Sequence, residues 1–268
     1  MFSGALLVLF VMLVLPTPAR AESTLRLQLP DTLEPIGATT FDGTGHAIGQ
    51  SRFEIDTQPD GLRTMQVTMG IDDGASMVSQ ATLAPVASGL GGAAGDPAVA
   101  LQLIEERSIA TSADGQNFPL LVVDHTAGRV SCYPDGDATR PGKHIDIPDE
   151  DRLVNVPMQL FFLPLARGEI NSLRFQIAAC GDGPVLHRML AERHTPIERD
   201  GRRIVEVEYG PDLGKAVAWL AGDLLPSFSF WFDASNGTYL GHRMPIHRKG
   251  PEVTLVRQGL TPPEIGID

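Results

Sequence analysis

Apolar and polar residues alternate along most of the chain. In residues 25–29, for example, every second position is a leucine and the positions between are polar. A period of two is typical of β-strands that bury one face. This pattern, together with short apolar runs of similar length, predicts strands at 25–29, 36–41, 47–56, 63–69, 75–84, 99–111, 118–124, 129–133, 143–147, 171–179, 185–193, 202–209, 227–233, 238–248 and 252–258.

Turn-forming sequences separate many of the predicted strands. Asp–Gly pairs begin at positions 60, 73, 114 and 200, and Asn236–Gly237 lies between two of the last strands. Such pairs favour tight hairpins, and strands joined by hairpins pair as antiparallel neighbours. The 28 glycines and 21 prolines are spread along the chain rather than gathered in one tract. We therefore expect an all-β, mainly antiparallel fold.

The segment 151–165 breaks the alternation. Asn155 can cap a helix that has Pro157 in its first turn, and Pro164 is expected to end it. Most residues between the two prolines are apolar, so this helix must be surrounded by protein or by a partner. A curved sheet, either a half-barrel or an open barrel, would enclose it. A second short helix is expected at 212–221.

Residues 1–21 are typical of a signal peptide. Positions 5–15 form an apolar run that is too short to cross a bilayer as a helix, and positions 19–21 read Ala-Arg-Ala, a form that signal peptidase accepts. We expect cleavage after Ala21, a periplasmic or secreted location, and a single β domain over 22–268. Because no Lys or Arg precedes the apolar run, an uncleaved anchor is the alternative.

The charge of the chain argues against two classes of partner. The sequence has 21 Lys and Arg against 33 Asp and Glu, a formal net charge of -12, and removal of the signal peptide takes away only Arg20 among the charged residues. A surface of this sign repels nucleic acid and anionic membranes. We therefore expect no nucleic-acid partner, and no stable membrane insertion once the signal peptide is removed.

The sequence has two cysteines, Cys132 and Cys180. An even number of cysteines in an exported protein favours a disulfide, which for a loop of this length would stabilise the fold by about 4 kcal/mol in the chain-entropy model. Two buried free thiols are the alternative. A metal site is not expected, because neither cysteine has a CxxC partner or a histidine at ligand spacing.

The predicted hairpin at 227–248 carries aromatic residues and histidines. Alternation places Phe228, Phe230 and Phe232 on one face of its first strand and Trp231 on the other. A face shared by three aromatic side chains is expected to pack into the core.

On the return strand of this hairpin, alternation places Leu240 and His242 on one face and Tyr239 on the opposite one. His242, alone on an apolar face, is expected to be a core histidine; a role as general base would require a carboxylate beside it. His247 is five positions away and points to the other side, so the two histidines cannot bind one metal ion.

Other candidate sites are weaker. Asp124 and His125 are adjacent and are expected to start a turn rather than to form a catalytic pair. The stretch 135–146 has aspartates at positions 1, 3 and 12 of a calcium-loop template but has Arg140 where the template needs glycine, so a solvated loop is expected. The motifs GxSxG, HExxH, GxGxxG, SxxK and the P-loop are absent from the sequence. We assign no catalytic residue, metal or cofactor.

Several short sequences occur in an order that resembles a known family. They are GATTFDG at 37–43, IGQSRF at 48–53, DRLV at 151–154, RFQI at 174–177, FWFD at 230–233 and LGHRMPI at 240–246. In this order the chain resembles an uncharacterised family of bacterial envelope proteins, of the domain-of-unknown-function kind, whose fold is similar to the periplasmic lipoprotein carriers. The resemblance implies a curved antiparallel sheet partly wrapped round helices. It implies no catalytic residues.

Three functions are compatible with these features. The first is a non-enzymatic binding or envelope-assembly module that holds an apolar, lipid- or acyl-like molecule on the concave face. The second is a hydrolase that uses a histidine such as His242 with a carboxylate, and the third is a scaffold that binds an envelope protein through 85–98 or 134–142. For the first function the expected ligand contacts are Phe161, Phe162, Phe230, Trp231 and His242, and the alternative, which the pattern favours for each aromatic residue taken singly, is ordinary core.

Overall fold

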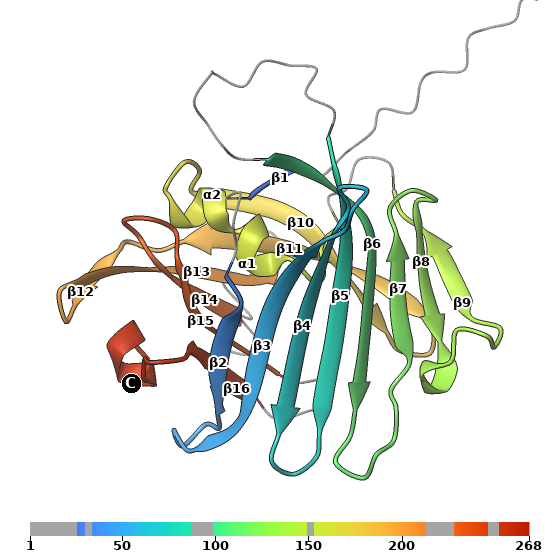
Figure 1. Cartoon of the computed structure of the whole chain (residues 1–268), viewed down its shortest axis with the longest axis horizontal. Coiled ribbons are helices and arrows are strands. Elements are labelled where there is room, and N and C mark those ends of the chain that lie inside the picture. The colour runs from blue at the N-terminus through green and yellow to red at the C-terminus, as the bar shows by residue number, and fades with distance from the viewer. Residues whose placement is uncertain are drawn as a thin grey trace, which may run out of the picture.

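The computed structural model describes residues 26–29, 34–86, 99–148, 153–212, 228–245 and 252–267. In these ranges the protein is a single curved sheet of sixteen antiparallel strands with a few short helices (Figure 1). The expected signal peptide, most of the loop 85–98, the helix expected after Asp212, and His247 lie outside the described residues.

The strands agree with the alternation pattern within a few residues at each end. They are β1 (Arg26–Leu29), β2 (Ile36–Phe41), β3 (Ala47–Thr57), β4 (Arg63–Ile71), β5 (Ser76–Pro85), β6 (Val99–Thr111), β7 (Leu120–Asp124), β8 (Arg129–Tyr133), β9 (Lys143–Asp146), β10 (Ser172–Cys180), β11 (Pro184–Arg193), β12 (Ile197–Arg199), β13 (Arg202–Pro211), β14 (Phe228–Asp233), β15 (Tyr239–Pro245) and β16 (Glu252–Arg257). The short strand β12 was not predicted, because three residues are too few to show a period.

The order of the strands is that of a meander with one long-range junction. From one end the order is β10-β11-β13-β14-β15-β16-β2-β3-β4-β5-β6-β7-β8-β9, while β1 pairs with β6 and β12 with β13. The pairing of β16 with β2 joins the two halves of the chain. Since β9 and β10 do not pair with each other, the sheet is open, and Figure 1 shows it curving round the helices. The predicted fold class, an open half-barrel, is confirmed.

A disulfide holds the two ends of the open sheet together. Cys132 lies on β8 and Cys180 on β10, their Cα atoms are 5.7 Å apart, and their sulfur atoms are bonded. Around them Leu121, Val130 and Ala178 form a separate buried cluster. The predicted disulfide is therefore confirmed, and it fastens the seam of the half-barrel.

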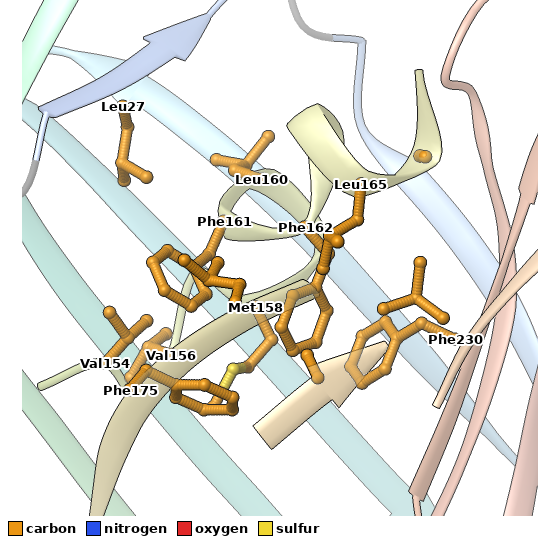
Figure 2. Packing of buried hydrophobic residues seen from close by; sticks show 14 of the residues in the cluster. Leu27, Val154, Val156, Met158, Leu160, Phe161, Phe162, Leu165, Phe175 and Phe230 are labelled. Carbon is orange, nitrogen blue, oxygen red and sulfur yellow. The ribbon is translucent and has the colours of Figure 1, made fainter. Parts of the chain in front are cut away.

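Two short helices lie on the concave side of the sheet: α1 (Met158–Phe161) and α2 (Leu163–Ala166). We call residues 158–166 the plug. Phe162 is fully buried at its centre, with its ring centroid 5.7 Å from that of Phe175 and 5.3 Å from that of Phe230 (Figure 2). The expectation that a curved sheet encloses this apolar segment is confirmed.

The details of the plug differ from the expected single helix. Asn155 does not cap α1: its Nδ2 donates to the carbonyl oxygen of Ala178 at 2.7 Å, and its Oδ1 accepts from the backbone N–H of Ala178 at 3.0 Å. Pro157 is at the cap position instead. Pro164 does not end the helical segment but lies in the first turn of α2, where no intrahelical N–H is required.

The C-terminal segment covers the outer face of the sheet. A 3₁₀ turn, η3 (Pro262–Ile265), follows β16, and Ile265 packs with Trp231, Leu240 and Val256 in a buried cluster. Gly241 permits this close approach, since a Cβ there would lie 2.8 Å from the Cδ1 of Ile265. The other short 3₁₀ turn in the described ranges is η1 (Pro134–Gly136), and no helix in those ranges has the length and apolarity to cross a membrane.

Candidate functional site

A cavity of about 170 Å³ lies on the concave side of the sheet, next to the plug. Its wall combines side chains from β4, β5, β10, β13, β14, β15 and β16 with residues 155–159. Four of the six methionines that follow the expected signal peptide line it, so we call it the methionine-lined cavity. These are Met69, Met77, Met158 and Met244.

The lining of the methionine-lined cavity contains no charged side chain among the described residues. Its remaining apolar surface comes from aliphatic residues and Phe230. Two of its polar side chains have partners: Ser79 Oγ is 2.7 Å from the Oγ of Ser108, and Asn155 is held by the backbone of Ala178. The cavity therefore suits an uncharged or largely apolar molecule better than an ion.

His242 lines this cavity and is bonded to Tyr239. The Nδ1 of His242 is 2.5 Å from the Oη of Tyr239, and its ring stacks on Phe230 with centroids 4.8 Å apart. Burial lowers the pKa of His242 to about 4 and raises the pKa of Tyr239. Both side chains are therefore uncharged at neutral pH.

The contact between Tyr239 and His242 corrects the expected assignment of faces. Trp231 pairs with Gly241 but Phe232 pairs with Tyr239, so Leu240 is an extra residue at a β-bulge. A bulge breaks the alternation. Tyr239 and His242 thus both face the concave side, while Leu240 packs on the outer face.

The residues expected to contact a ligand are divided between three places. Phe230 and His242 line the methionine-lined cavity. Phe161 and Phe162 are buried in the core between plug and sheet. Trp231 lies on the outer face of the sheet, in the cluster that η3 covers. Trp231 therefore does not face this cavity.

Sequence reasoning missed the buried carboxyl group of Glu106 on β6. Its side chain is 1% exposed; Oε1 is 2.9 Å from the Nε2 of His125, and Oε2 accepts the backbone N–H groups of Asn155 at 2.7 Å and Val156 at 2.5 Å. The partner of His125 is thus Glu106, whereas Asp124 accepts from the N–H of Ala127 in the predicted turn. The sequence does indicate a glutamate that faces inwards at this position. Glu105 and Glu106 are adjacent on one strand, and alternation requires one of two adjacent strand residues to face inwards.

The arrangement of Glu106 and His125 serves packing more directly than catalysis. Both carboxyl oxygens of Glu106 are used, one by His125 and the other by the chain that leads into the plug. The side chain of His125 is only 16% exposed. Among the described residues, the hydrogen bonds of this pair lead to the backbone at 155–156 and not to a serine, threonine or cysteine nucleophile.

Within the described ranges, no three His, Cys, Asp or Glu side chains lie where they could hold a metal ion together. In the calcium-like stretch, Asp135 pairs with Arg140, Asp137 accepts from Thr139, and Asp146 lies on β9. Asp135 and Asp137 of the template thus have partners within the stretch itself.

A second cavity of about 200 Å³ lies on the other side of the plug and shares Gln159 with the first. Its wall includes apolar residues such as Phe53 and Leu160, together with Arg167 and Arg257. Tyr239 also lines it, so the bonded pair of Tyr239 and His242 stands between the two cavities.

Comparisons with known proteins find similarity at the level of shape. No family model matches the chain, and no match to a curated protein was found. The structure is similar to a β-barrel-like protein of the domain of unknown function DUF1849 from Brucella abortus, with 10% identity and a TM-score of 0.45 over 83% of this chain and 94% of that chain. It is also similar to the hypothetical lipoprotein YmcC from Escherichia coli, with 9% identity and a TM-score of 0.32 over 86% of each chain. Neither protein is named for a ligand or an activity, and no function is transferred from them.

Proposed function

We propose that the protein is a non-enzymatic binding module of the periplasm or of the secreted fraction, which holds an apolar, lipid- or acyl-like ligand on the concave face of its sheet. The observation that carries this proposal is the methionine-lined cavity, whose lining has no charged side chain among the described residues. A concave, mainly apolar site with a few polar groups is the usual form of a small-molecule site.

The methionine content supports a ligand of variable shape. Methionine side chains are unbranched and flexible, so a surface rich in them adapts to different apolar partners. Met69 and Met77 are direct neighbours on paired strands, and Met158 and Met244 line the same cavity. Acyl chains, which differ in length and bend, suit a wall of this kind.

The compartment is inferred from the signal sequence and the disulfide. A disulfide persists in oxidising compartments such as the periplasm. The bond between Cys132 and Cys180 supports the export that residues 1–21 predict. The net charge of -12 disfavours adsorption to anionic membranes. These features fit a protein that carries its ligand in solution.

The first test fills the cavity. Val67 on β4 lines the cavity, so Val67→Phe places a bulkier ring in the space that a ligand would occupy. We expect the affinity for a fluorescent apolar probe such as 1-N-phenylnaphthylamine to fall by about tenfold, equal to about 1.4 kcal/mol. Fluorescence titration of the purified protein measures it.

The matched control is Val78→Phe. Val78 lies on the neighbouring strand β5, is 41% exposed and faces away from the cavity, so its replacement should leave probe affinity unchanged. Mass spectrometry of an organic extract of the wild-type protein, purified without detergent, should show co-purified lipid. A clean extract together with a probe that does not bind would refute the proposal and favour a scaffold acting through 134–142 or 85–98.

A further inference from the structure

Three side chains on the wall of the methionine-lined cavity, those of Tyr209, His242 and Gln159, have hydrogen-bonding atoms for which the described residues provide no partner. Tyr209 on β13 is 6% exposed and lines the cavity, and no other described residue forms a hydrogen bond with its hydroxyl group. His242 uses Nδ1 for the bond to Tyr239, which leaves Nε2. Hydrogen-bonding groups on the wall of a cavity are the groups that orient a bound ligand.

The hydrogen bond between Tyr239 and His242 bears on whether Nε2 of His242 is a donor or an acceptor. A neutral histidine carries one N–H, and burial keeps His242 neutral by lowering its pKa to about 4. In the tautomer in which the hydroxyl of Tyr239 donates to Nδ1, Nε2 of the neutral ring carries the hydrogen and is a donor. The proposal below uses this tautomer.

Tyr209 and His242 lie on the same face of the sheet. Tyr209, Phe230 and His242 belong to the consecutive strands β13, β14 and β15, and all three line the cavity. The ring of Phe230 is 6.1 Å from that of Tyr209 and 4.8 Å from that of His242, centroid to centroid. The rings of Tyr209 and His242 thus lie on either side of Phe230 in the order of the strands, and all three line the same cavity.

We propose that the cavity selects an uncharged acyl ester, whose carbonyl oxygen accepts hydrogen bonds from Tyr209 and His242 while its hydrocarbon chain lies against the methionines. This proposal rests on the proposed function. The lining contains no Lys or Arg among the described residues, so an ionised fatty acid would bury its carboxylate without a counter-charge. A plain hydrocarbon would leave both donors unpaired.

Three ligands of equal chain length test the proposal on the wild-type protein. Methyl laurate, dodecane and laurate compete with the fluorescent probe at pH 8, where laurate is ionised. We expect methyl laurate to displace the probe at the lowest concentration. Dodecane should need about three to ten times more, as expected for the loss of one or two hydrogen bonds, and laurate should be the weakest. Equal displacement by the ester and the hydrocarbon, or preference for laurate, would overturn the proposal.

A variant tests the role of Tyr209 directly. Tyr209→Phe removes only the hydroxyl group, so it should weaken binding of methyl laurate by about three- to tenfold and leave dodecane unchanged. Tyr133→Phe, on β8 and outside the cavity lining, is the control and should change neither. If Tyr209→Phe fails to fold, the order in which the three ligands displace the probe from the wild type still supports or overturns the proposal. A wild type that binds the probe but does not discriminate refutes this inference alone; a wild type that binds nothing refutes the proposed function as well.

Discussion

At the scale of single residues, Glu106 connects the sheet to the plug. Its carboxyl group accepts two backbone N–H groups at 155–156, just before α1, and contacts His125 at the end of β7. Among the described residues, it is the only acidic side chain that is buried. The plug is therefore held by a polar contact as well as by apolar packing.

Replacement of Glu106 should destabilise the protein. Glu106→Ala leaves the buried N–H of Val156 and that of Asn155 without an acceptor, and an unsatisfied buried group costs about 1–3 kcal/mol. We expect the free energy of unfolding to fall by about 3 kcal/mol, as measured by urea denaturation followed by circular dichroism.

The neighbouring residue provides the control for this variant. Glu105 on the same strand pairs with Arg107 near the surface, with 31% of its side chain exposed, and a pair of this kind contributes about 1 kcal/mol or less. Similar losses for Glu105→Ala and Glu106→Ala would show that Glu106 does not have the structural role inferred for it.

At the scale of elements, the two faces of the β14–β15 hairpin have different surroundings. Its bulge at Leu240 directs Tyr239 and His242 to the cavity side, while Trp231 and Leu240 pack under η3 on the outer side. Simple alternation predicted the inward aromatic face of β14 but not the pairing of Tyr239 with His242. A bulge depends on how the strand meets its neighbours, so the period of one strand does not reveal it.

A substitution at Gly241 tests the packing of this hairpin. A Cβ at this position would lie 2.5 Å from the carbonyl oxygen of Leu255, so Gly241→Ala should lower the free energy of unfolding by about 2 kcal/mol, as overpacking does. At Gly70, on β4, a Cβ would meet nothing within 4 Å, so Gly70→Ala should cause no loss. Thermal unfolding of both variants measures the difference, and equal melting temperatures would contradict the close approach.

At the scale of the whole molecule, the open sheet is stabilised across its seam by the disulfide. β9 and β10 end the strand order without pairing, and the bond between Cys132 and Cys180 joins β8 to β10 next to that gap. It closes a loop with a sequence separation of 48 residues. In the chain-entropy model, a loop of this length corresponds to about 4 kcal/mol.

Removal of the disulfide should therefore lower stability strongly. We expect the double variant Cys132→Ala with Cys180→Ala to lose up to about 4 kcal/mol of unfolding free energy, and the wild type in dithiothreitol to lose a similar amount. Guanidinium denaturation of both proteins measures the loss. The double variant should not respond to dithiothreitol; if the reduced wild type is as stable as the oxidised protein, the seam does not depend on this bond.

Much of the architecture follows from local features of the sequence. Strand period, turn pairs such as Asn236–Gly237 and the apolar segment around Phe162 act over a few residues, so a single sequence reveals them. With only two cysteines, one pairing was available. These features were sufficient to predict an antiparallel curved sheet with an enclosed helical segment.

The remaining features depend on contacts between distant parts of the chain. The junction of β16 with β2, the burial of Glu106 against the plug, and the meeting of β4, β5 and β13–β16 round one cavity all join residues far apart in sequence. Trp231 and His242 are both aromatic and close in sequence, yet they lie on opposite faces of the sheet. Which side chains line the cavity is set by the curvature of the sheet and by a bulge, and neither is encoded in the period of an individual strand.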